Sequence, residues 1–291
     1  MVAQRLDGRA CSQEVEADLT VRIQSCIERG IIPHIAVIIV GNDPASHVYV
    51  GAKIKACERL NLKSTHIELP EDTTQEKLRE IVGNLNNDDL VHGILVQSPL
   101  PKHLDEEELT DLIEPSKDVD GFHPTNLGRL VQGRIDGMLP CTPSGVMRLL
   151  DWAGIETRGK SAVVIGRSQN VGMPQALLLT ARGADATVTI AHSKTENIPE
   201  ICKSADIIVA AVGRPEMVKA DWVKQGAIVV DVGVNRVDDS SRERGWRLAG
   251  DVAPEVSEVA SWLSPVPGGV GPMTVAMLME NTVRSAENKS I

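Results

Sequence analysis

The stretch Ser161-Ala-Val-Val-Ile-Gly166-Arg-Ser168-Gln-Asn-Val-Gly172-Met-Pro174 decides the fold of the second half of this chain. A β-branched run ends at Gly166, a polar loop follows, and Gly172 opens the apolar segment 176–181. This order predicts the strand, turn and helix of a nucleotide-binding βαβ unit, in which glycine lets the backbone approach a phosphate and the helix N-terminus offers N–H groups. The spacing departs from G-x-G-x-x-G, because Ser168 replaces the second glycine and the last glycine comes one position late. An ordinary tight turn is therefore the alternative.

The residues after this unit indicate which cofactor it takes. The run 186–190 predicts a second strand, and Ser193 and Lys194 follow it. An NAD site usually carries an acidic residue there for the ribose hydroxyls. Hydroxyl and cationic donors, including Arg167 in the glycine loop, suit a 2′-phosphate instead. The pattern favours NADP over NAD, and the alternative is that these cations are solvated surface charges.

Composition excludes several classes of protein. The formal net charge of −10 over 291 residues argues against non-specific binding to nucleic acid or to anionic membranes. No apolar run has the length of a membrane span, and no signal-peptide core follows Arg5. The five cysteines are scattered without a C-x-x-C pair, which fits a reducing cytoplasm. No His, Cys and Asp cluster has metal-ligand spacing, so we expect no metal.

Strand-like and helix-like segments alternate along the chain, which predicts an α/β fold. The first half contains apolar strands at 35–40, 65–69 and 93–97, a helix at 46–60 with Ser46 as its candidate N-cap, and a capping box at Thr73-Thr-Gln-Glu76. The second half adds strands at 206–211 and 227–232, an exposed polar loop at 238–245 and a closing helix at 273–286. The sequence predicts a catalytic domain over 1–142, closed by a C-terminal helix at 272–291, and a Rossmann-like domain with a doubly wound parallel sheet over 143–271.

Tyr49 and Lys53 are candidates for chemistry because they lie four residues apart, on one face of the helix predicted at 46–60. That helix follows a strand end, where open α/β sheets place their ligands. A lysine desolvated there is a candidate general base near neutral pH. The alternative is an amphipathic tyrosine at the edge of the core beside a solvated lysine.

Three further segments point to the same place. Gln97 ends the strand predicted at 93–97, Asp120 lies in the loop Asp118-Val-Asp120-Gly-Phe122, and the glycine-rich segment Pro267–Gly271 precedes a helix. A strand-end amide and a carboxylate loop at one crevice are typical of a polar binding site, and dense glycine favours close approach to a ligand. The alternatives are a simple strand end, a common Asp-Gly turn and a flexible connector.

Taken together, these motifs resemble a known family over essentially the whole chain. Tyr49-x-x-x-Lys53, Gly93-Ile-Leu-Val-Gln97-x-Pro-Leu-Pro101, Lys117-Asp-Val-Asp120-Gly-Phe, the Gly166 loop and Pro265-Val-Pro-Gly-Gly-Val-Gly-Pro-Met-Thr274 are similar to those of bifunctional methylenetetrahydrofolate dehydrogenase/methenyltetrahydrofolate cyclohydrolase. The resemblance implies NADP-dependent oxidation of methylenetetrahydrofolate and hydrolysis of the methenyl product to formyltetrahydrofolate in a shared site. It also implies a homodimer of two α/β domains that flank a cleft.

The resemblance assigns roles residue by residue. Lys53 would be the catalytic lysine of the cyclohydrolase step, Tyr49 its neighbour against the folate, and Gln97 the residue that tunes Lys53. Asp120 would hold the pterin ring. The residues that would line the NADP site are Gly166, Arg167, Ser168, Ser193 and Val234. Those that would border the folate are Pro99, Pro267, Gly268, Gly269, Val270 and Gly271.

Two departures from the family pattern leave this expectation intact. Ser98 stands where the family more often has an apolar residue, and Ala191 stands where cysteine is frequent. Two other functions remain open at this point. One is a different two-domain NADP enzyme such as a shikimate-type dehydrogenase. An assay that compares turnover of methylenetetrahydrofolate with turnover of shikimate distinguishes this function from the folate activity. The other is a non-catalytic NADP-binding sensor, which single-turnover assays exclude or support.

Overall fold

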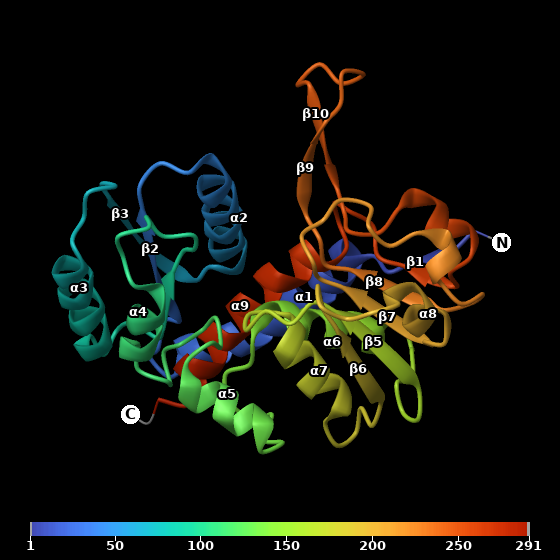
Figure 1. The fold of residues 1–291 in the computed structure, drawn as a ribbon. Helices are drawn as coiled ribbons and strands as arrows, with labels where there is room; N and C mark the ends of the chain where they lie inside the picture. The colour runs from blue at the N-terminus through green and yellow to red at the C-terminus, as the bar shows by residue number, and fades with distance from the viewer. Residues whose placement is uncertain (1, 290–291) are drawn as a thin grey trace. The chain divides into compact units, whose positions relative to one another are not determined.

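The structure of the chain is a computed structural model that describes residues 2–289, without the side chains of residues 44 and 45. The chain forms two compact units (Figure 1). The residues up to Gln13 and Thr142–Thr274 make up the six-stranded unit, whereas Glu14–Cys141 and the residues from Val275 onward make up the three-stranded unit.

The six-stranded unit contains a parallel sheet with the strand order β1-β11-β8-β7-β5-β6. The bounds of its strands are β1 Gln4–Arg5, β5 Ser161–Ile165, β6 Thr187–Ala191, β7 Ile207–Ala210, β8 Ile228–Asp231 and β11 Trp262–Leu263. The chain passes from β5 to β6 on one side and then to β7 on the other side of β5. The strand order therefore reverses between β5 and β7, which is the point where doubly wound sheets bind their ligands.

Apolar side chains fill the interior of this unit. Strand β7 is buried along its whole length, as expected for a central parallel strand that is covered on both faces. Its core consists of aliphatic residues such as Val163, Ile208 and Val229. The helices of this part of the chain are α6 Cys141–Trp152, α7 Gly172–Thr180 and α8 Ile198–Lys203, with 3₁₀ turns at η1 Ala220–Trp222 and η2 Pro254–Glu258.

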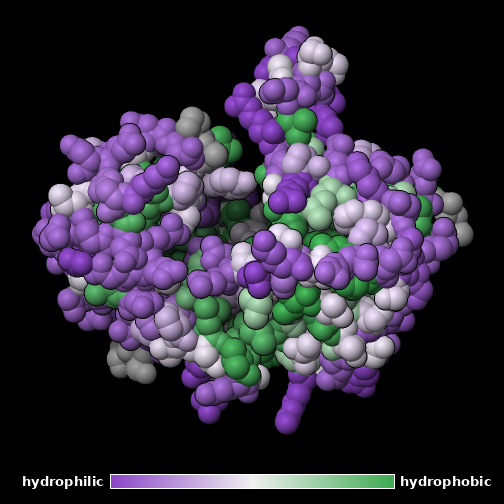
Figure 2. Space-filling model, in the orientation of Figure 1, coloured by the Kyte–Doolittle hydropathy of each residue, from purple (hydrophilic) through white to green (hydrophobic). Residues whose placement is uncertain are grey.

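An antiparallel hairpin extends from the six-stranded unit, formed by β9 (Asn235–Asp238) and β10 (Trp246–Ala249). Figure 2 shows that its surface is mostly hydrophilic. The segment 238–245 was predicted as an exposed loop. Its first residue, Asp238, is the last residue of β9, and residues 239–245 form the tip of the hairpin. Strands β9 and β10 were not predicted from the sequence, because they are short and carry charged residues. The guanidinium groups of Arg236 and Arg244 lie 4.8 and 4.1 Å from the centroid of the Trp246 ring.

The three-stranded unit contains a parallel sheet with the order β3-β2-β4. Its strands are β2 His34–Val40, β3 Lys63–Leu69 and β4 Gly93–Val96, and every residue of β2 is buried. The helices of this part of the chain are α1 Gly8–Glu28, α2 Pro44–Leu60, α3 Gln75–Asn87, α4 Glu106–Leu112, α5 Pro124–Val131 and α9 Val270–Glu287. The strand order reverses between β2 and β4, so this sheet also has a switch point.

Several element boundaries differ from the sequence expectation. Asp43 caps α2 by accepting a hydrogen bond from the backbone N–H of Ser46 at 2.8 Å, so Ser46 is not the cap. The cap of α3 is Thr74. Helix α5 lies in a stretch rich in Asp, Gly and Pro, which has no helical pattern in the sequence. Helix α9 begins at Val270, three residues before the predicted start, so Val270 and Gly271 belong to the helix.

The fold also places the N-terminal segment. Strand β1 pairs with β11 in the six-stranded sheet, so the first described residues cluster with the Rossmann-like unit. A two-residue strand has no sequence pattern that reveals its partner. No helix within residues 2–289 has the length and apolar composition needed to cross a membrane.

Candidate active site

The central contact of the three-stranded unit joins Lys53 on α2 to Gln97 at the end of β4. The ammonium Nζ of Lys53 donates a hydrogen bond to Oε1 of Gln97 at 2.9 Å. The backbone N–H of Gln97 donates to the carbonyl of Ile38 in β2 at 2.8 Å, which continues the ladder between the two strands. Lys53 and Gln97 therefore meet at the carboxyl ends of β2 and β4, where the strand order reverses.

The side-chain amide of Gln97 is held in one orientation. Its Nε2 donates to the backbone carbonyl of Ser98 at 2.6 Å, so the carbonyl oxygen of the amide faces Lys53. The hydroxyl of Ser98 in turn donates to the carboxylate of Glu106 on α4. Ser98, which departs from the family pattern, thus ties the strand end to α4.

The surroundings of Lys53 disfavour its charged form. Burial lowers the pKa of the Lys53 amine below its usual value, and the nearby charge of Asp120 opposes this shift in part. The neutral amine is therefore more populated near neutral pH than in an exposed lysine. A neutral amine has a lone pair that accepts a proton, which is what a general base requires.

Asp120 reaches this place through the segment that precedes it. The backbone N–H of Ile94 in β4 donates to the carbonyl of Lys117 at 2.8 Å, and Ile94 and Asp118 form a parallel bridge. The segment 117–120 therefore runs beside β4 and carries Asp120 toward the end of the strand. Burial raises the pKa of the Asp120 carboxyl, whereas the charge of Lys53 lowers it. The two groups thus favour each other's ionised form.

Asp118 fixes the loop that bears Asp120. Its carboxylate accepts hydrogen bonds from the backbone N–H groups of Gly121 at 3.1 Å and His123 at 2.8 Å, and from the side-chain amide of Asn126 at 2.9 Å. Gly121 has a φ of +81°, and a Cβ there would lie 2.4 Å from the backbone carbon of Leu139. The Asp-Gly pair is therefore a turn, and the turn serves to position Asp120.

Cys141 is a neighbour of this site that the sequence did not reveal. Its thiol donates to the carbonyl of Val119 at 3.2 Å, and a hydrogen bond with Cys141 lowers the pKa of Asp120. Burial and the charge of Asp120 raise the pKa of the Cys141 thiol well above its usual value, so the thiol stays protonated. In the sequence Cys141 was one of five scattered cysteines, with no motif that linked it to Asp120.

Tyr49 and Pro99 border the same region. Tyr49 precedes Lys53 by one turn of α2, and its side chain is 48% exposed, which leaves the ring open to a flat molecule. Pro99 follows Ser98 through a cis peptide bond. The three-stranded unit thus brings together Lys53, Gln97 and Asp120, with Tyr49 and Pro99 nearby in the chain.

In the six-stranded unit, the glycine loop has the steric features of a nucleotide cradle. Gly166 has a φ of +127°, and a Cβ there would lie 2.2 Å from the carbonyl oxygen of Ala211. The loops after β5 and β7 therefore meet at the switch point of this sheet. A Cβ at Gly172 would lie 2.3 Å from the carbonyl oxygen of Gly166, so α7 begins directly against the loop. Only glycine fits at both positions.

Ser168 changes how this loop presents its N–H groups. Its hydroxyl oxygen accepts hydrogen bonds from the backbone N–H groups of Val171 at 3.2 Å and Gly172 at 3.3 Å. The N–H of Met173 donates to the carbonyl of Ser168 at 3.0 Å. The expectation that the first N–H groups of the helix are free for a phosphate is therefore wrong for these three residues. The serine that replaces glycine in the fingerprint therefore ties the loop to the start of α7, whose N-cap residue is Val171.

The structure places Arg167 and Ser193 on adjacent strand ends. Ile165 in β5 pairs with Ala191 in β6, and Arg167 and Ser193 each follow their member of this pair by two residues. Both residues are exposed, and in residues 2–289 Arg167 makes no ion pair shorter than 4 Å. Val234, which follows β8, is 44% exposed. These groups are available to a ligand at one edge of the sheet.

Two buried carboxylates, which no sequence motif indicated, organise the neighbouring loops. Asp251 accepts from the N–H groups of Val212 at 2.6 Å and Gly213 at 2.9 Å, which follow β7. Asp231 at the end of β8 accepts from the N–H of Val252 at 3.0 Å and from that of Asp251 at 2.9 Å. The pair therefore joins the loops at the carboxyl ends of β7 and β8.

The glycine-rich segment predicted to border the folate lies in the six-stranded unit. The N–H of Gly269 donates to the carbonyl of Pro265 at 2.8 Å. A Cβ at Gly8 would lie 1.7 Å from the carbonyl oxygen of Gly269, so the segment packs directly on the start of α1. Pro267, Gly268 and Gly269 form the turn, and Val270 and Gly271 begin α9.

Comparison with protein families identifies both halves of the chain. The model described as tetrahydrofolate dehydrogenase/cyclohydrolase, catalytic domain, matches residues 6–120. The model described as the NAD(P)-binding domain of tetrahydrofolate dehydrogenase/cyclohydrolase matches residues 140–290.

Full-length relatives agree with these matches. The Bifunctional protein FolD of Chlorobium chlorochromatii is 54% identical over 285 residues, which cover 96% of this chain and 97% of the relative. The structure of the methylenetetrahydrofolate dehydrogenase/cyclohydrolase from Campylobacter jejuni has a TM-score of 0.93 at 48% identity, covering 98% of this chain and 99% of the other. That of the Trypanosoma brucei enzyme, complexed with NADP cofactor and inhibitor, has a TM-score of 0.93 at 40% identity, covering 99% and 98%.

Proposed function

This chain belongs to the tetrahydrofolate dehydrogenase/cyclohydrolase family, and from that premise we propose that Lys53, Gln97 and Asp120 form the centre at which both reactions of the family take place. The protein is an NADP-dependent methylenetetrahydrofolate dehydrogenase and a methenyltetrahydrofolate cyclohydrolase. Family membership sets aside the shikimate-type alternative. The observation that carries the proposal is the 2.9 Å hydrogen bond from Lys53 to Gln97, in surroundings that lower the pKa of the amine.

Lys53 handles the protons of the hydrolysis. The methenyl product of the oxidation is a cation whose bridging carbon is attacked by water. As the water oxygen bonds to that carbon, the neutral amine of Lys53 takes the proton that the water loses. Lys53 then returns that proton to the ring nitrogen whose bond to the carbon breaks, and the remaining hydroxyl proton leaves to solvent as the C=O bond of the formyl group forms. The lowered pKa of Lys53 favours this cycle because a fully charged ammonium has no lone pair to accept the first proton.

Gln97 and Asp120 have different tasks. Gln97 is a positioning residue, because its fixed amide carbonyl accepts from Nζ and directs the amine without adding charge. Asp120 binds the polar edge of the folate, since its carboxylate is held by the Asp118 turn and accepts hydrogen bonds from ring N–H groups. Tyr49 and Pro99 supply apolar surface for the ring system.

The residues of the six-stranded unit fit NADP. Gly166 and Gly172 let the loop pack at backbone distance against Ala211 and against the start of α7, and Arg167 and Ser193 provide a cation and a hydroxyl for the 2′-phosphate. Ser168 shapes the loop, and Val234 offers an apolar contact. When bound, NADP accepts the hydride of the oxidation. The protein's own contribution is to orient the reactants and exclude water.

The decisive test is the variant Lys53→Met. We expect cyclohydrolase activity to fall by about a hundred- to ten-thousand-fold, as is typical when one acid–base group is lost. NADP affinity should stay unchanged, because Lys53 lies in the other unit. Hydrolysis of methenyltetrahydrofolate at the wild-type rate would show that Lys53 is not the base. A wild-type protein that binds NADP but turns over neither substrate in a single-turnover assay would instead be the sensor.

The choice of cofactor has its own test in Arg167→Ala. The KM for NADP should rise about ten- to a hundredfold and that for NAD should barely change, because only NADP has a 2′-phosphate for the guanidinium to bind. Steady-state kinetics with both cofactors measure the two constants. Equal increases would indicate a general defect of the loop. Lys194 follows β6, the strand beside β5, and the same kinetics with Lys194→Ala show whether this second cation contributes to NADP binding.

We also propose boundaries for the two domains, an oligomeric state and a cellular compartment. We place the folate domain at 1–142, closed by 272–291, and the NADP domain at 143–271, with the difference that the residues up to Gln13 cluster with the NADP domain through the pairing of β1 and β11. We propose a homodimer, supported by the resemblance and by the hairpin of β9 and β10, whose two strands pair only with each other in the described chain. A cytoplasmic location fits five buried cysteines without a disulfide among them. Light scattering on the purified protein measures the assembly, and a monomeric mass would refute the dimer.

A further inference from the structure

The orientation of the Gln97 amide depends on the residue that follows it in the chain. The backbone N–H of Gln97 still belongs to the ladder between β4 and β2, since it donates to Ile38. The next carbonyl, that of Ser98, belongs to the peptide bond with Pro99, which has no N–H, and lies beyond the strand. Side chains hold this carbonyl: it accepts from Nε2 of Gln97 at 2.6 Å and, at a longer 3.5 Å, from the hydroxyl of Ser46.

The hydroxyl of Ser98 attaches this peptide to helix α4. It donates to the carboxylate of Glu106, the first residue of that helix, and a hydrogen bond to a carboxylate is stronger than one between neutral groups. The start of α4 is itself fixed to α3. The side chain of Gln75 accepts from the backbone N–H of Asp105 at 2.9 Å and donates to its carbonyl at 3.1 Å. Leu109, in the next turn of α4, is fully buried. Ser98 is therefore bound to an element with a fixed position.

Three hydrogen bonds in series connect α4 to Lys53. Glu106 accepts from the hydroxyl of Ser98, and the carbonyl of Ser98 accepts from Nε2 of Gln97. The other end of the same amide, Oε1 of Gln97, accepts from Lys53. An amide turned by 180° would place its oxygen against the carbonyl of Ser98 and its NH₂ group against the ammonium of Lys53. Both of these contacts are unfavourable, so a fixed Ser98 carbonyl selects the orientation that serves Lys53.

We propose that Ser98 and Glu106 are positioning residues for the hydrolysis of methenyltetrahydrofolate, which they support by holding the amide of Gln97 in one orientation. Neither residue moves a proton, and both act through the amide that directs the amine of Lys53. The inference rests on the role proposed for Lys53, because an amine that moves no proton needs no such support. An apolar side chain, which the family more often has in place of Ser98, cannot donate to Glu106. The support is therefore a property of this chain's own sequence.

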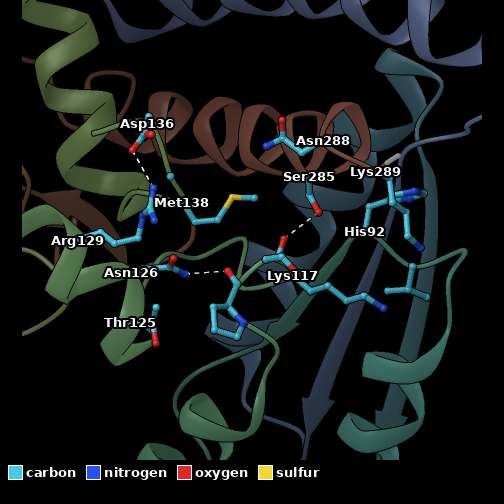
Figure 3. Close-up of a pocket in the computed structure, with 14 residues that line it drawn as sticks. His92, Lys117, Thr125, Asn126, Arg129, Asp136, Met138, Ser285, Asn288 and Lys289 are labelled. Atoms are coloured by element: carbon cyan, nitrogen blue, oxygen red, sulfur yellow. Dashed lines mark hydrogen bonds and ion pairs between the residues drawn. The ribbon is translucent and has the colours of Figure 1, made fainter. Parts of the chain in front are cut away.

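Asp120, the other polar group of the site, has a support of its own. The carboxylate of Asp118 fixes its loop. The side-chain amide of Asn126 donates to that carboxylate and also to the carbonyl of Pro115, each at 2.9 Å, and Figure 3 shows the second of these bonds. None of these bonds passes through Ser98. Loss of the Ser98 hydroxyl should therefore leave folate binding intact and act on the hydrolysis.

Ser98→Ala is a cleaner test than a change of Glu106. Burial raises the pKa of the Asp120 carboxyl and the charge of Glu106 adds to this shift, so a change of Glu106 would also alter the folate contact. A cavity of about 30 Å³ borders Ser98 and Glu106. It has room for a water molecule that hydrogen-bonds to the carboxylate when the hydroxyl is removed. We therefore expect Ser98→Ala to fold, and its thermal unfolding midpoint verifies this.

Steady-state kinetics of both reactions measure the effect of Ser98→Ala. We expect the kcat of the cyclohydrolase to fall by about three- to thirtyfold, because the amine of Lys53 is no longer directed at the reacting water. The KM for methenyltetrahydrofolate and the kcat of the dehydrogenase should stay close to their wild-type values.

Two further variants separate the hydrogen bond from general effects on the loop. Ser98→Thr keeps the hydroxyl and should restore the cyclohydrolase kcat. Thr110→Val is the matched control, because it removes a hydroxyl that borders the same cavity but donates to the backbone carbonyl of Glu106 at 3.0 Å. It should leave both activities unchanged.

The decisive comparison is made in a Gln97→Ala background. There Ser98→Ala should lower the cyclohydrolase kcat no further, because the residue that transmits its effect is absent, whereas a general structural defect would lower it again. The proposal is overturned if Ser98→Ala keeps the wild-type kcat, if it lowers both activities equally, or if its effect persists without Gln97. Wild-type hydrolysis by Lys53→Met would overturn the proposed function as well, which distinguishes that failure from a failure of the Ser98 support alone.

Discussion

At the scale of single residues, the hydrogen bond from Lys53 to Gln97 adds no charge beside the amine, because its acceptor is a neutral amide carbonyl. The protonation of the amine therefore depends on the other groups around it. The variant Gln97→Glu places a carboxylate at the same distance and should raise the pKa of Lys53. Cyclohydrolase activity depends on the neutral amine, so it rises with pH through this pKa. We expect that rise to move to higher pH in the variant, with reduced activity near neutrality.

The pH profile of cyclohydrolase activity measures this shift, after subtraction of the spontaneous hydrolysis recorded without enzyme. Gln97→Ala is the control, because it removes the hydrogen bond without adding charge and should lower the rate with a smaller displacement of the profile. Dehydrogenase activity should change less in both variants, since hydride transfer needs no proton from Lys53. An unmoved profile in Gln97→Glu would mean that Lys53 does not titrate in the cyclohydrolase step.

At the scale of elements, the start of α7 depends on the absence of a side chain at Gly172. A Cβ there would lie 2.3 Å from the carbonyl oxygen of Gly166. Gly172→Ala should therefore weaken NADP binding by at least tenfold and destabilise the protein by about 1–3 kcal/mol, typical of overpacking. Gly83→Ala is the matched control, because Gly83 lies within α3 with open space around it, and alanine there should stabilise the helix by up to about 1 kcal/mol. Denaturant unfolding and NADP titration measure both effects, and equal behaviour of the two variants would contradict the steric account.

Elements also show what the sequence could predict. Long apolar strands such as β2 and β5 were found because buried parallel strands read as continuous aliphatic runs. Lys53 and Gln97 were singled out because each lies near the carboxyl end of such a strand. Cys141 and Asp251 were not, because their importance arises only when distant segments meet. Strand β1 and the hairpin strands are too short or too polar to leave a pattern.

At the scale of the whole molecule, each unit has its own aliphatic core, one around Val163 and Ile208 and the other around Ile38 and Leu78. The NADP residues belong to the six-stranded unit and Lys53 to the other. NADP at about a hundred times its dissociation constant should stabilise the unit that binds it by about 2.7 kcal/mol. We expect hydrogen exchange to slow in β5, β7 and β8 and to stay unchanged in β2 and β4, because the latter strands gain no ligand contact.

Mass-spectrometric hydrogen exchange with and without NADP measures this difference strand by strand. Arg167→Ala, examined at the same NADP concentration, should reduce the protection of β5, β7 and β8 in proportion to its lost affinity. Equal slowing in β2 and β4 would show that the two cores open in one cooperative step. In that case the two units would be one thermodynamic domain, and binding of NADP would stabilise the folate site directly.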